Sequence, residues 1–422
     1  MKVLGRVPTT RSGGLPNDLH PRGRVRIVYI VTAVETAQTL LRGQLAFLRN
    51  AGFEIELICG TLGDGSELEP VAQREGIVVH CVPMVRSVSI SDDVRSLAVL
   101  VRLLRSRSPD LVNVSTPKAG LLGGIAAVLA RVPIRVYLIR GLRAETERGL
   151  RRGILLGLES VACRCAHHIV CVSPSLRRKV LDLRLSKPDR TVVLGVGASN
   201  GVDMPRFAAT PERSAEARVL RRKLGLSDTT FVVGFVGRIV RDKGVAELVG
   251  AFEQLLKNDH PDGVATHLVV VGTYEPDDRI DERTRSVLER HPSISFVPWT
   301  DPARWYPVMD VVVLPTFREG FPNVPLEAGA AGRAVVTTNA TGAVDSVVDG
   351  ITGIVVPCGD MVALERALRE LRDDPGLRSR LGDGGLRWVA ANYTNEQIWA
   401  LTETFYRGLF PAERWLTSGG VA

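Results

Sequence analysis

Short apolar runs alternate with longer amphipathic segments along almost the whole chain. Residues 25–32, 134–139 and 231–236 are rich in β-branched side chains and carry few charges. Such runs predict strands that are buried on both faces, as strands of parallel sheets are. The segments between them have one apolar stripe, as in residues 92–107, and predict the helices that connect parallel strands. The pattern therefore predicts an α/β protein with helices on both faces of its sheets.

The alternating pattern occurs twice, which predicts two domains. A turn signal at residues 200–203, Asn-Gly-Val-Asp, separates the two halves. We predict Rossmann-like, doubly wound parallel sheets in residues 24–205 and in residues 206–394, facing one another across a central cleft. Residues 1–23 are rich in Gly, Pro and Arg and are expected to be a disordered tail. Residues 395–422 are expected to form a last helix that packs back on the first domain, then a tail.

Charge is distributed unevenly between the two halves. The net charge is +8, yet residues 1–200 hold 29 Lys and Arg against 16 Asp and Glu. An anionic partner of the first half is therefore expected, and nucleic acid, an anionic membrane surface and a phosphorylated substrate all qualify. The basic half lacks interleaved exposed aromatic residues, which argues against nucleic acid. No apolar run approaches the ~20 residues of a membrane-spanning helix, so a soluble or peripheral protein is expected.

The six cysteines do not indicate a metal centre. Their spacing matches no standard zinc pattern, and several fall inside apolar runs, where cysteine acts as a small core residue. We therefore predict reduced thiols, no metal site and no bound cofactor. The cysteines are Cys59, Cys81, Cys163, Cys165, Cys171 and Cys358.

Residues 310–360 are the stretch around which the chain is organised. An apolar strand, residues 311–314, leads into a polar loop and then into a helix that starts near Pro325. A helix start at the carboxyl end of a parallel strand favours a diphosphate. Glu319 lies in the loop and Glu327 in the first turns of the helix, and carboxylates accept hydrogen bonds from sugar or ribose hydroxyls.

A second strand–loop–helix junction follows residues 231–236. Gly237 lets a ligand approach the backbone, while Arg238 and Lys243 offer cations to phosphate oxygens. The motif GRIVRDKG is neither an ATP-type P-loop nor a dinucleotide fingerprint. Gly272 ends the next predicted strand and could shape a nucleotide pocket.

The first half offers cations at the same side of its predicted sheet. Lys118 follows the strand at residues 110–113 and is a candidate for holding an acceptor phosphate. Arg140 and Arg143 leave the carboxyl end of the strand at residues 134–139. Each of these cations could equally be a solvated surface charge.

The motifs together resemble the GT-B glycosyltransferases, specifically glycosyltransferase family 4. The resemblance runs from Val25 to about Leu409 and is most specific at Gly237-Arg238 with Lys243-Gly244, at GFPNVPLE and at DGITGIVVP. The segments STPKAGLLG, RGLRAETERG, CVSPSLR and SNGVD resemble the capsular and exopolysaccharide branch of the family. Members of this branch extend a lipid-diphosphate-linked sugar at the cytoplasmic face of the membrane.

The resemblance implies a retaining, metal-independent transfer from a nucleotide-diphosphate sugar, here a UDP-sugar. Stabilisation of the departing diphosphate by cations and N–H groups is then the main catalytic device. The implied catalytic residues are Glu319, Arg238 and Lys243. The implied donor-binding residues are Gly237, Gly272, Gly320, Phe321, Pro322, Asn323, Val324 and Glu327, with Glu327 on the ribose hydroxyls. The candidate acceptor-binding residues are Lys118 and Arg143.

The acceptor implied by the resemblance is a polyprenyl-diphosphate-linked glycan, and the enzyme would be cytoplasmic and peripheral on the inner face of the cytoplasmic membrane. The basic first domain would contact that membrane. Alternatives are the same chemistry on a soluble oligosaccharide and, from another reaction class, a nucleotide-sugar epimerase. Many family members place a histidine near the donor sugar where this chain has Arg140-Gly141, so the resemblance leaves the donor sugar open.

Overall fold

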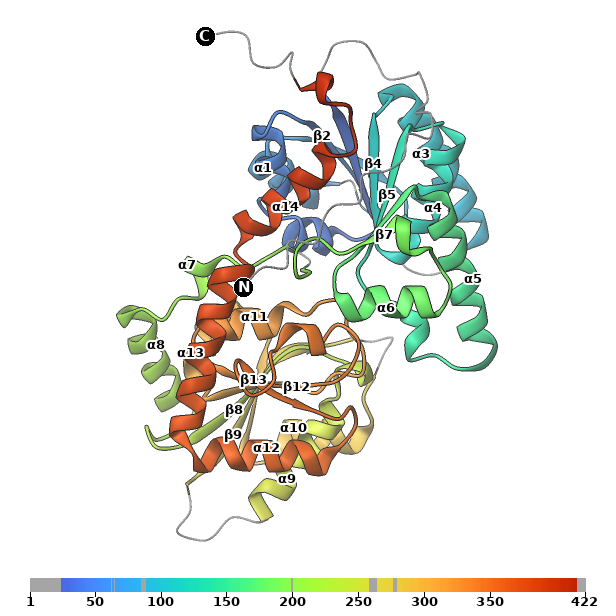
Figure 1. Cartoon of the computed structure of the whole chain (residues 1–422). Helices are drawn as coiled ribbons and strands as arrows, with labels where there is room; N and C mark the ends of the chain where they lie inside the picture. The colour runs from blue at the N-terminus through green and yellow to red at the C-terminus, as the bar shows by residue number, and fades with distance from the viewer. Residues whose placement is uncertain are drawn as a thin grey trace, which may run out of the picture.

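A computed structural model describes residues 24–415 of the chain, apart from 62, 64, 85–88, 199, 258–263 and 276–278. The tail expected at residues 1–23 and the end of the chain from residue 416 lie outside the described residues. Two separate sheets organise the molecule, with helices on both faces of each (Figure 1). The predicted α/β fold with two doubly wound parallel sheets is confirmed.

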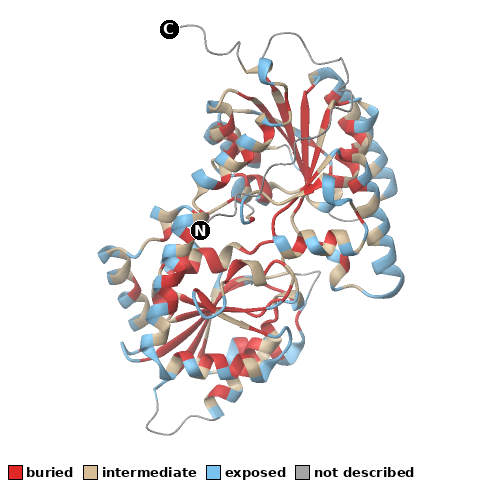
Figure 2. Cartoon of the chain, in the orientation of Figure 1, coloured by how far each residue is buried: buried red, intermediate tan, exposed pale blue. Residues whose placement is uncertain are grey.

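The first sheet has the strand order β3-β2-β1-β4-β5-β6-β7, and all of its pairs are parallel. Apart from the edge strand β3, its strands are largely buried, as the apolar runs predict (Figure 2). They are β1 (Arg26–Val31), β2 (Glu54–Gly60), β3 (Val78–Val82), β4 (Leu111–Ser115), β5 (Ile134–Ile139), β6 (His168–Cys171) and β7 (Thr191–Val192).

Helices cover the first sheet on both faces. One face packs against α3, α4 and α5, and the other packs against α1, α2 and the last helix of the chain. Ser173 caps α6 by accepting a hydrogen bond from the N–H of Leu176. The helices are α1 (Gln44–Asn50), α2 (Glu69–Glu75), α3 (Ile90–Arg107), α4 (Pro117–Leu129), α5 (Gly149–Cys165) and α6 (Pro174–Asp182), with the 3-10 turn η3 at Arg143–Glu145.

The second sheet has the order β10-β9-β8-β11-β12-β13 and is also parallel throughout. Its strands are β8 (Phe231–Ile239), β9 (Thr266–Tyr274), β10 (Ile294–Pro298), β11 (Val311–Leu314), β12 (Ala334–Thr338) and β13 (Gly353–Val356). Its helices are α7 (Met204–Phe207), α8 (Pro211–Lys223), α9 (Val245–Lys257), α10 (Glu282–Arg290), α11 (Asn323–Ala330), α12 (Met361–Asp373) and α13 (Pro375–Asn392).

Each sheet contains one point where the strand order reverses. The chain builds outward from β1 to β3 and then returns to place β4 on the other side of β1; β8 and β11 have the same relation. Loops that leave the carboxyl ends of such a strand pair diverge, and the crevice between them is where open α/β sheets bind ligands. The fold therefore predicts one ligand region in each domain.

The carboxyl ends of the two sheets face each other. Thr341, which follows β12, donates to Glu145 in η3 over 2.6 Å. The N–H of Gly342 donates to Ser175 Oγ over 2.7 Å, and the N–H of Ser175 donates to Asp345 over 2.9 Å. Loops at the ligand side of one sheet thus contact loops at the ligand side of the other.

The last helix, α14 (Asn395–Arg407), returns to the first domain after α13 of the second (Figure 1). It starts with a capping box formed by Thr394 and Gln397. The Tyr406 hydroxyl reaches the Tyr29 hydroxyl at 2.8 Å and accepts a hydrogen bond from Asn113 at 2.6 Å. The chain therefore passes from one domain to the other twice, once before β8 and once after α13.

Candidate active site

The loops that leave β8 and β11 are joined to each other at the reversal point of the second sheet. The main-chain oxygen of Asp242 accepts hydrogen bonds from Thr316 Oγ1 and from the N–H of Phe317, both over 2.8 Å. The Asp242 carboxylate forms an ion pair with Arg318 at 2.6 Å. The predicted phosphate loop and the loop that carries Glu319 consequently form one structural unit.

Lys243 and Glu319 form an ion pair across this unit. Their side chains are only 19% and 14% exposed, so each charge is substantially desolvated and holds the other in place. A carboxylate that accepts from sugar hydroxyls is thereby fixed beside a cation that attracts phosphate. The structure brings together two of the three residues predicted to be catalytic.

Arg238, the third of them, lies near the end of β8 with its side chain 60% exposed. Its only described ion pair is a long one, 3.5 Å to Glu275, so its guanidinium remains accessible. Gly237 precedes it with a φ of 150°, and the backbone of Gly237 lies directly against Gly272 of β9. A Cβ at Gly272 would collide with the Gly237 oxygen, so close strand packing already requires a glycine there.

The loop at residues 320–322 packs closely against the first domain. A Cβ on Gly320 would collide with the main-chain oxygen of Arg140, and one on Gly342 would collide with the Gly320 oxygen. The Phe321 ring turns away into the core, 5.4 Å from the ring of Tyr393. Only the backbone of this segment is therefore available to a donor sugar.

Helix α11 begins at Asn323, after Pro322 in the N-cap position, and no side chain caps it. Its free N–H groups and the positive end of its dipole lie next to the Glu319 loop. Val324 follows in the first turn. In the described part of the chain, the buried Asn323 Oδ1 has no hydrogen-bond partner. The start of α11 thus offers free N–H groups that could donate to an anion. Beside them, Asn323 Oδ1 is a hydrogen-bond acceptor that is not in use.

Glu327 is held by a residue that the sequence did not single out. The Tyr306 hydroxyl donates to Glu327 Oε2 over 2.7 Å. Burial raises the pKa of Glu327, while the hydrogen bond from Tyr306 and the charge of Arg206 act in the opposite direction. No sequence motif marks Tyr306, because it lies in a short 3-10 turn that approaches α11 only in the folded chain.

The reversal point of the first sheet is strained. Thr116 adopts a φ of 76°, which is rare for a residue other than glycine, and its hydroxyl lies 2.7 Å from that of Thr32. Lys118, two residues on, forms an ion pair with Asp93 of α3 at 2.6 Å. Arg143 is exposed in η3. Both cations belong to the cleft side of the sheet, and their contact with an acceptor stays a prediction.

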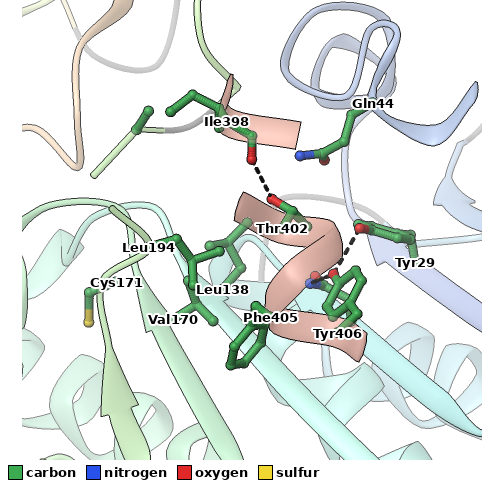
Figure 3. A pocket seen from close by; sticks show the side chains of 12 residues that line it. Tyr29, Gln44, Leu138, Val170, Cys171, Leu194, Ile398, Thr402, Phe405 and Tyr406 are labelled. Carbon is green, nitrogen blue, oxygen red and sulfur yellow. Dashed lines mark hydrogen bonds between the residues drawn. The ribbon is translucent and has the colours of Figure 1, made fainter. Parts of the chain in front are cut away.

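An enclosed cavity of about 30 Å³ lies under α14 in the first domain, lined among others by Tyr29, Gln44, Asn113, Thr402 and Tyr406 (Figure 3). This volume holds a water molecule or two and no sugar. Among the described residues, no group of three or more His, Cys, Asp or Glu side chains is placed to hold a metal ion. The cations and the helix start at the second sheet are therefore the stronger candidate for substrate binding.

Two family models match the chain, one in each domain. Residues 36–197 match the model described as "Glycosyl transferase 4-like domain", and residues 230–374 match "Glycosyl transferases group 1". The second range contains every residue predicted to bind the donor. Fold and matches together define a GT-B glycosyltransferase.

The similarity to a curated relative extends over nearly the full length of both proteins. The chain is 36% identical over 382 residues to "Capsular polysaccharide biosynthesis glycosyltransferase CapM" of Staphylococcus aureus, covering 90% of this chain and 96% of the relative. The protein therefore belongs to glycosyltransferase family 4. It is also 26% identical over 359 residues to "UDP-Gal:alpha-D-GlcNAc-diphosphoundecaprenol alpha-1,3-galactosyltransferase" of Escherichia coli, covering 84% and 89%.

Solved structures share the fold. Sucrose-phosphate synthase from Thermosynechococcus elongatus matches with a TM-score of 0.74 and 22% identity, covering 92% of this chain and 99% of that one. Anabaena HepE in complex with UDP matches with a TM-score of 0.72 and 19% identity, covering 91% and 100%. HepE has also been solved with UDP-glucose.

Proposed function

We propose that this protein transfers a sugar, with retention of anomeric configuration, from a UDP-sugar to a polyprenyl-diphosphate-linked glycan of a surface polysaccharide. The observation that carries the proposal is the Lys243–Glu319 ion pair beside the start of α11 at the reversal point between β8 and β11, with the accessible Arg238 near the end of β8. This arrangement offers fixed positive charge to a diphosphate and a fixed carboxylate to the sugar beside it.

The chemistry follows from where these charges lie. The bond between the anomeric carbon and the phosphate oxygen breaks, and Arg238, Lys243 and the α11 N–H groups stabilise the negative charge on the leaving diphosphate. The acceptor hydroxyl attacks from the face that the leaving group vacates, and a β-phosphate oxygen takes its proton. Protein cations supply the electrostatic stabilisation, so we propose that the reaction needs no metal ion.

Uridine is the base favoured by the relatives. The Escherichia coli relative is named for UDP-galactose, and the HepE structures hold UDP or UDP-glucose. Glu327, fixed by Tyr306, would accept hydrogen bonds from the two ribose hydroxyls. The backbone of residues 320–323 and Glu319 would hold the sugar.

The proposed acceptor is a lipid diphosphate, as the name of the same relative indicates for that enzyme. An outer face of the first domain, formed by α3 and α5, suits a membrane surface. Ile90 and Leu150 are each 81% exposed there, and Val94 and Ile154 are more than half exposed. The face also carries arginines at helix positions 102, 105, 151 and 152.

Aliphatic side chains among arginines suit a lipid bilayer, whose headgroups are anionic and whose interior is apolar. None of the described helices is long and apolar enough to cross a bilayer. We therefore propose peripheral contact through this α3–α5 face, at the inner surface of the cytoplasmic membrane.

Donor binding tests the proposal. Calorimetric titration of UDP-, GDP- and dTDP-sugars, with EDTA present, would compare wild type with Arg238→Ala and Glu327→Ala. Arg283→Ala serves as the matched control, because Arg283 is 78% exposed on α10 and pairs with Glu253. We expect a UDP-sugar to bind without metal, and each site variant to bind it at least about tenfold more weakly.

The donor site would be overturned if the wild type bound no nucleotide sugar. It would also be overturned if both site variants bound the nucleotide sugar as tightly as the wild type does. Co-sedimentation with vesicles that contain phosphatidylglycerol separates the acceptor classes: protein that stays in the supernatant favours a soluble oligosaccharide acceptor. Conversion of the UDP-sugar to an isomer without any acceptor would instead identify an epimerase.

A further inference from the structure

Arg140, which follows β5, has a buried guanidinium without a hydrogen-bond partner. Its Nε, Nη1 and Nη2 are all removed from solvent, and within the described part of the chain none of them has an acceptor. Among the described arginines, Arg140 alone has all three side-chain nitrogens both buried and unpaired. Burial lowers the pKa of Arg140 to about 10, so the group remains protonated at neutral pH.

A second arginine on the same strand shows what a structural arginine looks like here. Arg135 donates from Nε to the Cys165 oxygen over 2.7 Å and from Nη1 to the Val132 oxygen over 2.8 Å. Its Nη2 contacts the His167 ring at 2.6 Å. All three nitrogens of Arg135 are thus satisfied within the protein, whereas those of Arg140 are not.

Among the described residues, none supplies a counter-charge to Arg140. The groups that raise its pKa are the hydroxyls of Tyr29 and Tyr406, which are neutral at physiological pH because burial raises the pKa of each. On the neighbouring strand, Asn113 Oδ1 and Ser115 Oγ are buried and lack partners among the described residues. Unused donors and unused acceptors therefore gather at the carboxyl ends of β4 and β5.

The position of Arg140 is next to the candidate donor site. Its main-chain oxygen lies against Gly320, the residue that follows Glu319, and Gly141 lies against the N–H of the same residue. Glu145, five residues along, holds the loop after β12 through Thr341. The backbone of Arg140 thus lies where the first domain meets the sugar-binding loop of the second.

A buried guanidinium without an anion is costly, and this cost is removed when an oxyanion binds, because the planar fork matches a carboxylate or phosphate with two hydrogen bonds. We propose that Arg140 binds an oxyanion of a substrate held between the domains. The inference rests on the proposed transferase function and adds to it a specificity-determining residue from the first domain.

Two substrate groups have the required chemistry. One is a carboxylate on the donor sugar, as in a hexuronate, which would lie against the loop at Gly320. The other is a diphosphate, on the donor or on the lipid-linked acceptor. If Arg140 binds a carboxylate, it should affect the affinity only for a donor that carries one. If it binds a diphosphate, it should affect the affinity for ligands that carry a diphosphate, so a panel of matched ligands separates the two cases.

The experiment measures affinities by calorimetry for wild type, Arg140→Gln, Arg140→Lys and Arg135→Gln, with melting temperatures for each. The ligands are UDP, UDP-glucose, UDP-glucuronate, geranylgeranyl-diphosphoryl N-acetylglucosamine and the octyl glycoside of the same sugar. UDP-glucose and UDP-glucuronate differ only at C6, and the two acceptor probes differ chiefly in the diphosphate. Arg135→Gln is the control for loss of a structural arginine: it should lower the melting temperature and leave ligand preference unchanged.

We expect Arg140→Gln to keep the wild-type melting temperature and to lose about tenfold or more in affinity for one class of anionic ligand. A loss confined to UDP-glucuronate places the oxyanion on the donor sugar. A loss for UDP or for the lipid diphosphate, with the octyl glycoside unaffected, places it on a diphosphate. Arg140→Lys should recover part of the loss, since lysine keeps the charge without the fork.

Affinities of Arg140→Gln that equal those of wild type for all five ligands would overturn the inference while leaving the transferase function intact. A wild type that binds no UDP would overturn the proposed function, and this inference with it. A drop in melting temperature of Arg140→Gln as large as that of Arg135→Gln, without any change in affinity, would assign Arg140 a structural role and also overturn the inference.

Discussion

In two carboxyl groups of this protein, Glu327 and Glu159, a single hydrogen bond from a tyrosine opposes the effect of burial on the pKa. Glu327 and Glu159 each accept a hydrogen bond from a buried tyrosine, Tyr306 and Tyr137 respectively, over 2.7 Å in both cases. Burial raises the pKa of both carboxyl groups, and the tyrosine hydroxyl lowers it again by favouring the ionised form. The first carboxylate belongs to the proposed donor site, whereas the second lies between β5 and α5.

Removal of the Tyr306 hydroxyl should weaken nucleotide binding. In Tyr306→Phe, Glu327 loses both its fixed orientation and the donor that stabilises its ionised form. We expect an affinity for UDP about three- to tenfold lower at pH 7.5, with a larger loss at pH 6 because the pKa of Glu327 rises further. Calorimetry at the two pH values measures this. A variant that binds UDP as wild type does at both would show that Tyr306 does not position Glu327.

Glu159 should make the protein less stable as pH rises. Burial raises the pKa of Glu159 from the ordinary 4.5 to about 7, so the folded protein holds this proton more tightly than the unfolded chain does. The stabilisation is complete below about pH 4.5 and is lost as pH rises to about 7. Glu159→Gln removes the titration, and Gln can still accept from Tyr137.

We therefore expect Glu159→Gln to be more stable than wild type by about 1–3 kcal/mol at pH 8, and the difference to shrink towards pH 5. Urea denaturation at pH 5, 6.5 and 8 gives the free energies of unfolding. Glu396→Gln, at an exposed position of α14, is the control. A stability difference that does not change with pH would contradict the assignment.

Charged residues in loops after predicted strands can be placed from the sequence, whereas residues that approach them only in the folded chain cannot. Glu319, Lys243 and Arg238 follow predicted strands directly, so the strand pattern alone places them at one edge of a sheet. Tyr306 has no such position, because a turn between two strands brings it to α11. The unpaired state of Arg140 likewise depends on which groups surround it, and a sequence does not list the acceptors that are missing.

At the scale of elements, strand cores were predictable and helix ends were less so. The strands β5 and β11 cover the predicted ranges, because apolar β-branched runs are bounded sharply by charged or turn residues. Helix α11 starts at Asn323, earlier than Pro325 suggests, since Pro322 occupies the N-cap position. Segment 36–40 forms a π-helical turn that no periodicity indicates.

Helix α14 is held on the first domain by a tryptophan as well as by Tyr406. The Trp399 indole donates to Asn200 over 2.8 Å and lies 5.6 Å from the ring of Phe47. Gly43, at a φ of 77°, leaves room for this indole, since a Cβ there would collide with it.

Trp399→Ala should destabilise the protein by about 2–4 kcal/mol, through lost packing and loss of the donor to Asn200 Oδ1. Trp399→Phe keeps most of the packing and should cost about 1 kcal/mol. Urea denaturation measures both, and limited proteolysis reports whether α14 is released first. Equal stability of Trp399→Ala and wild type would mean that Tyr406 and its neighbours suffice to hold the helix.

At the scale of the whole molecule, the parallel direction of the strands follows from the alternation of strands and helices, because a helix between two strands carries the chain back to the end at which the first strand began. The contacts between the two domains do not follow from any such rule. Asp345, Ser175, Glu145 and Thr341 are ordinary loop residues in the sequence, and only the folded chain opposes them. The mutual arrangement of the domains is therefore the part that the sequence left undetermined.

These contacts have a consequence for catalysis. The proposed donor site lies on the second domain, whereas Arg140 and the candidate acceptor residues lie on the first, so the reaction needs the domains together. Asp345 accepts from both the N–H and the hydroxyl of Ser175, and the same hydroxyl accepts from Gly342. Three hydrogen bonds therefore join Ser175 to the loops of the second domain.

Loss of this contact should separate binding from turnover. In Asp345→Ala we expect affinity for UDP within about twofold of wild type, because no group that would hold the nucleotide is changed. The turnover number should fall about tenfold, since the closed arrangement is populated less. Small-angle scattering should show a larger radius of gyration for the variant. Asp383→Ala, an exposed position on α13, should change none of these quantities.

This expectation would be contradicted if Asp345→Ala lowered the affinity for UDP by the same factor as the turnover number. Such a result would mean that Asp345 supports the donor site itself rather than the closed arrangement of the domains. Asp345→Asn sharpens the test, because the amide oxygen can still accept from the Ser175 N–H and should restore part of the turnover. Ser175 lies at the start of α6 and Asp345 beside the loop that supports Gly320, so this contact and the packing of the Arg140 backbone against the sugar-binding loop belong to one interface.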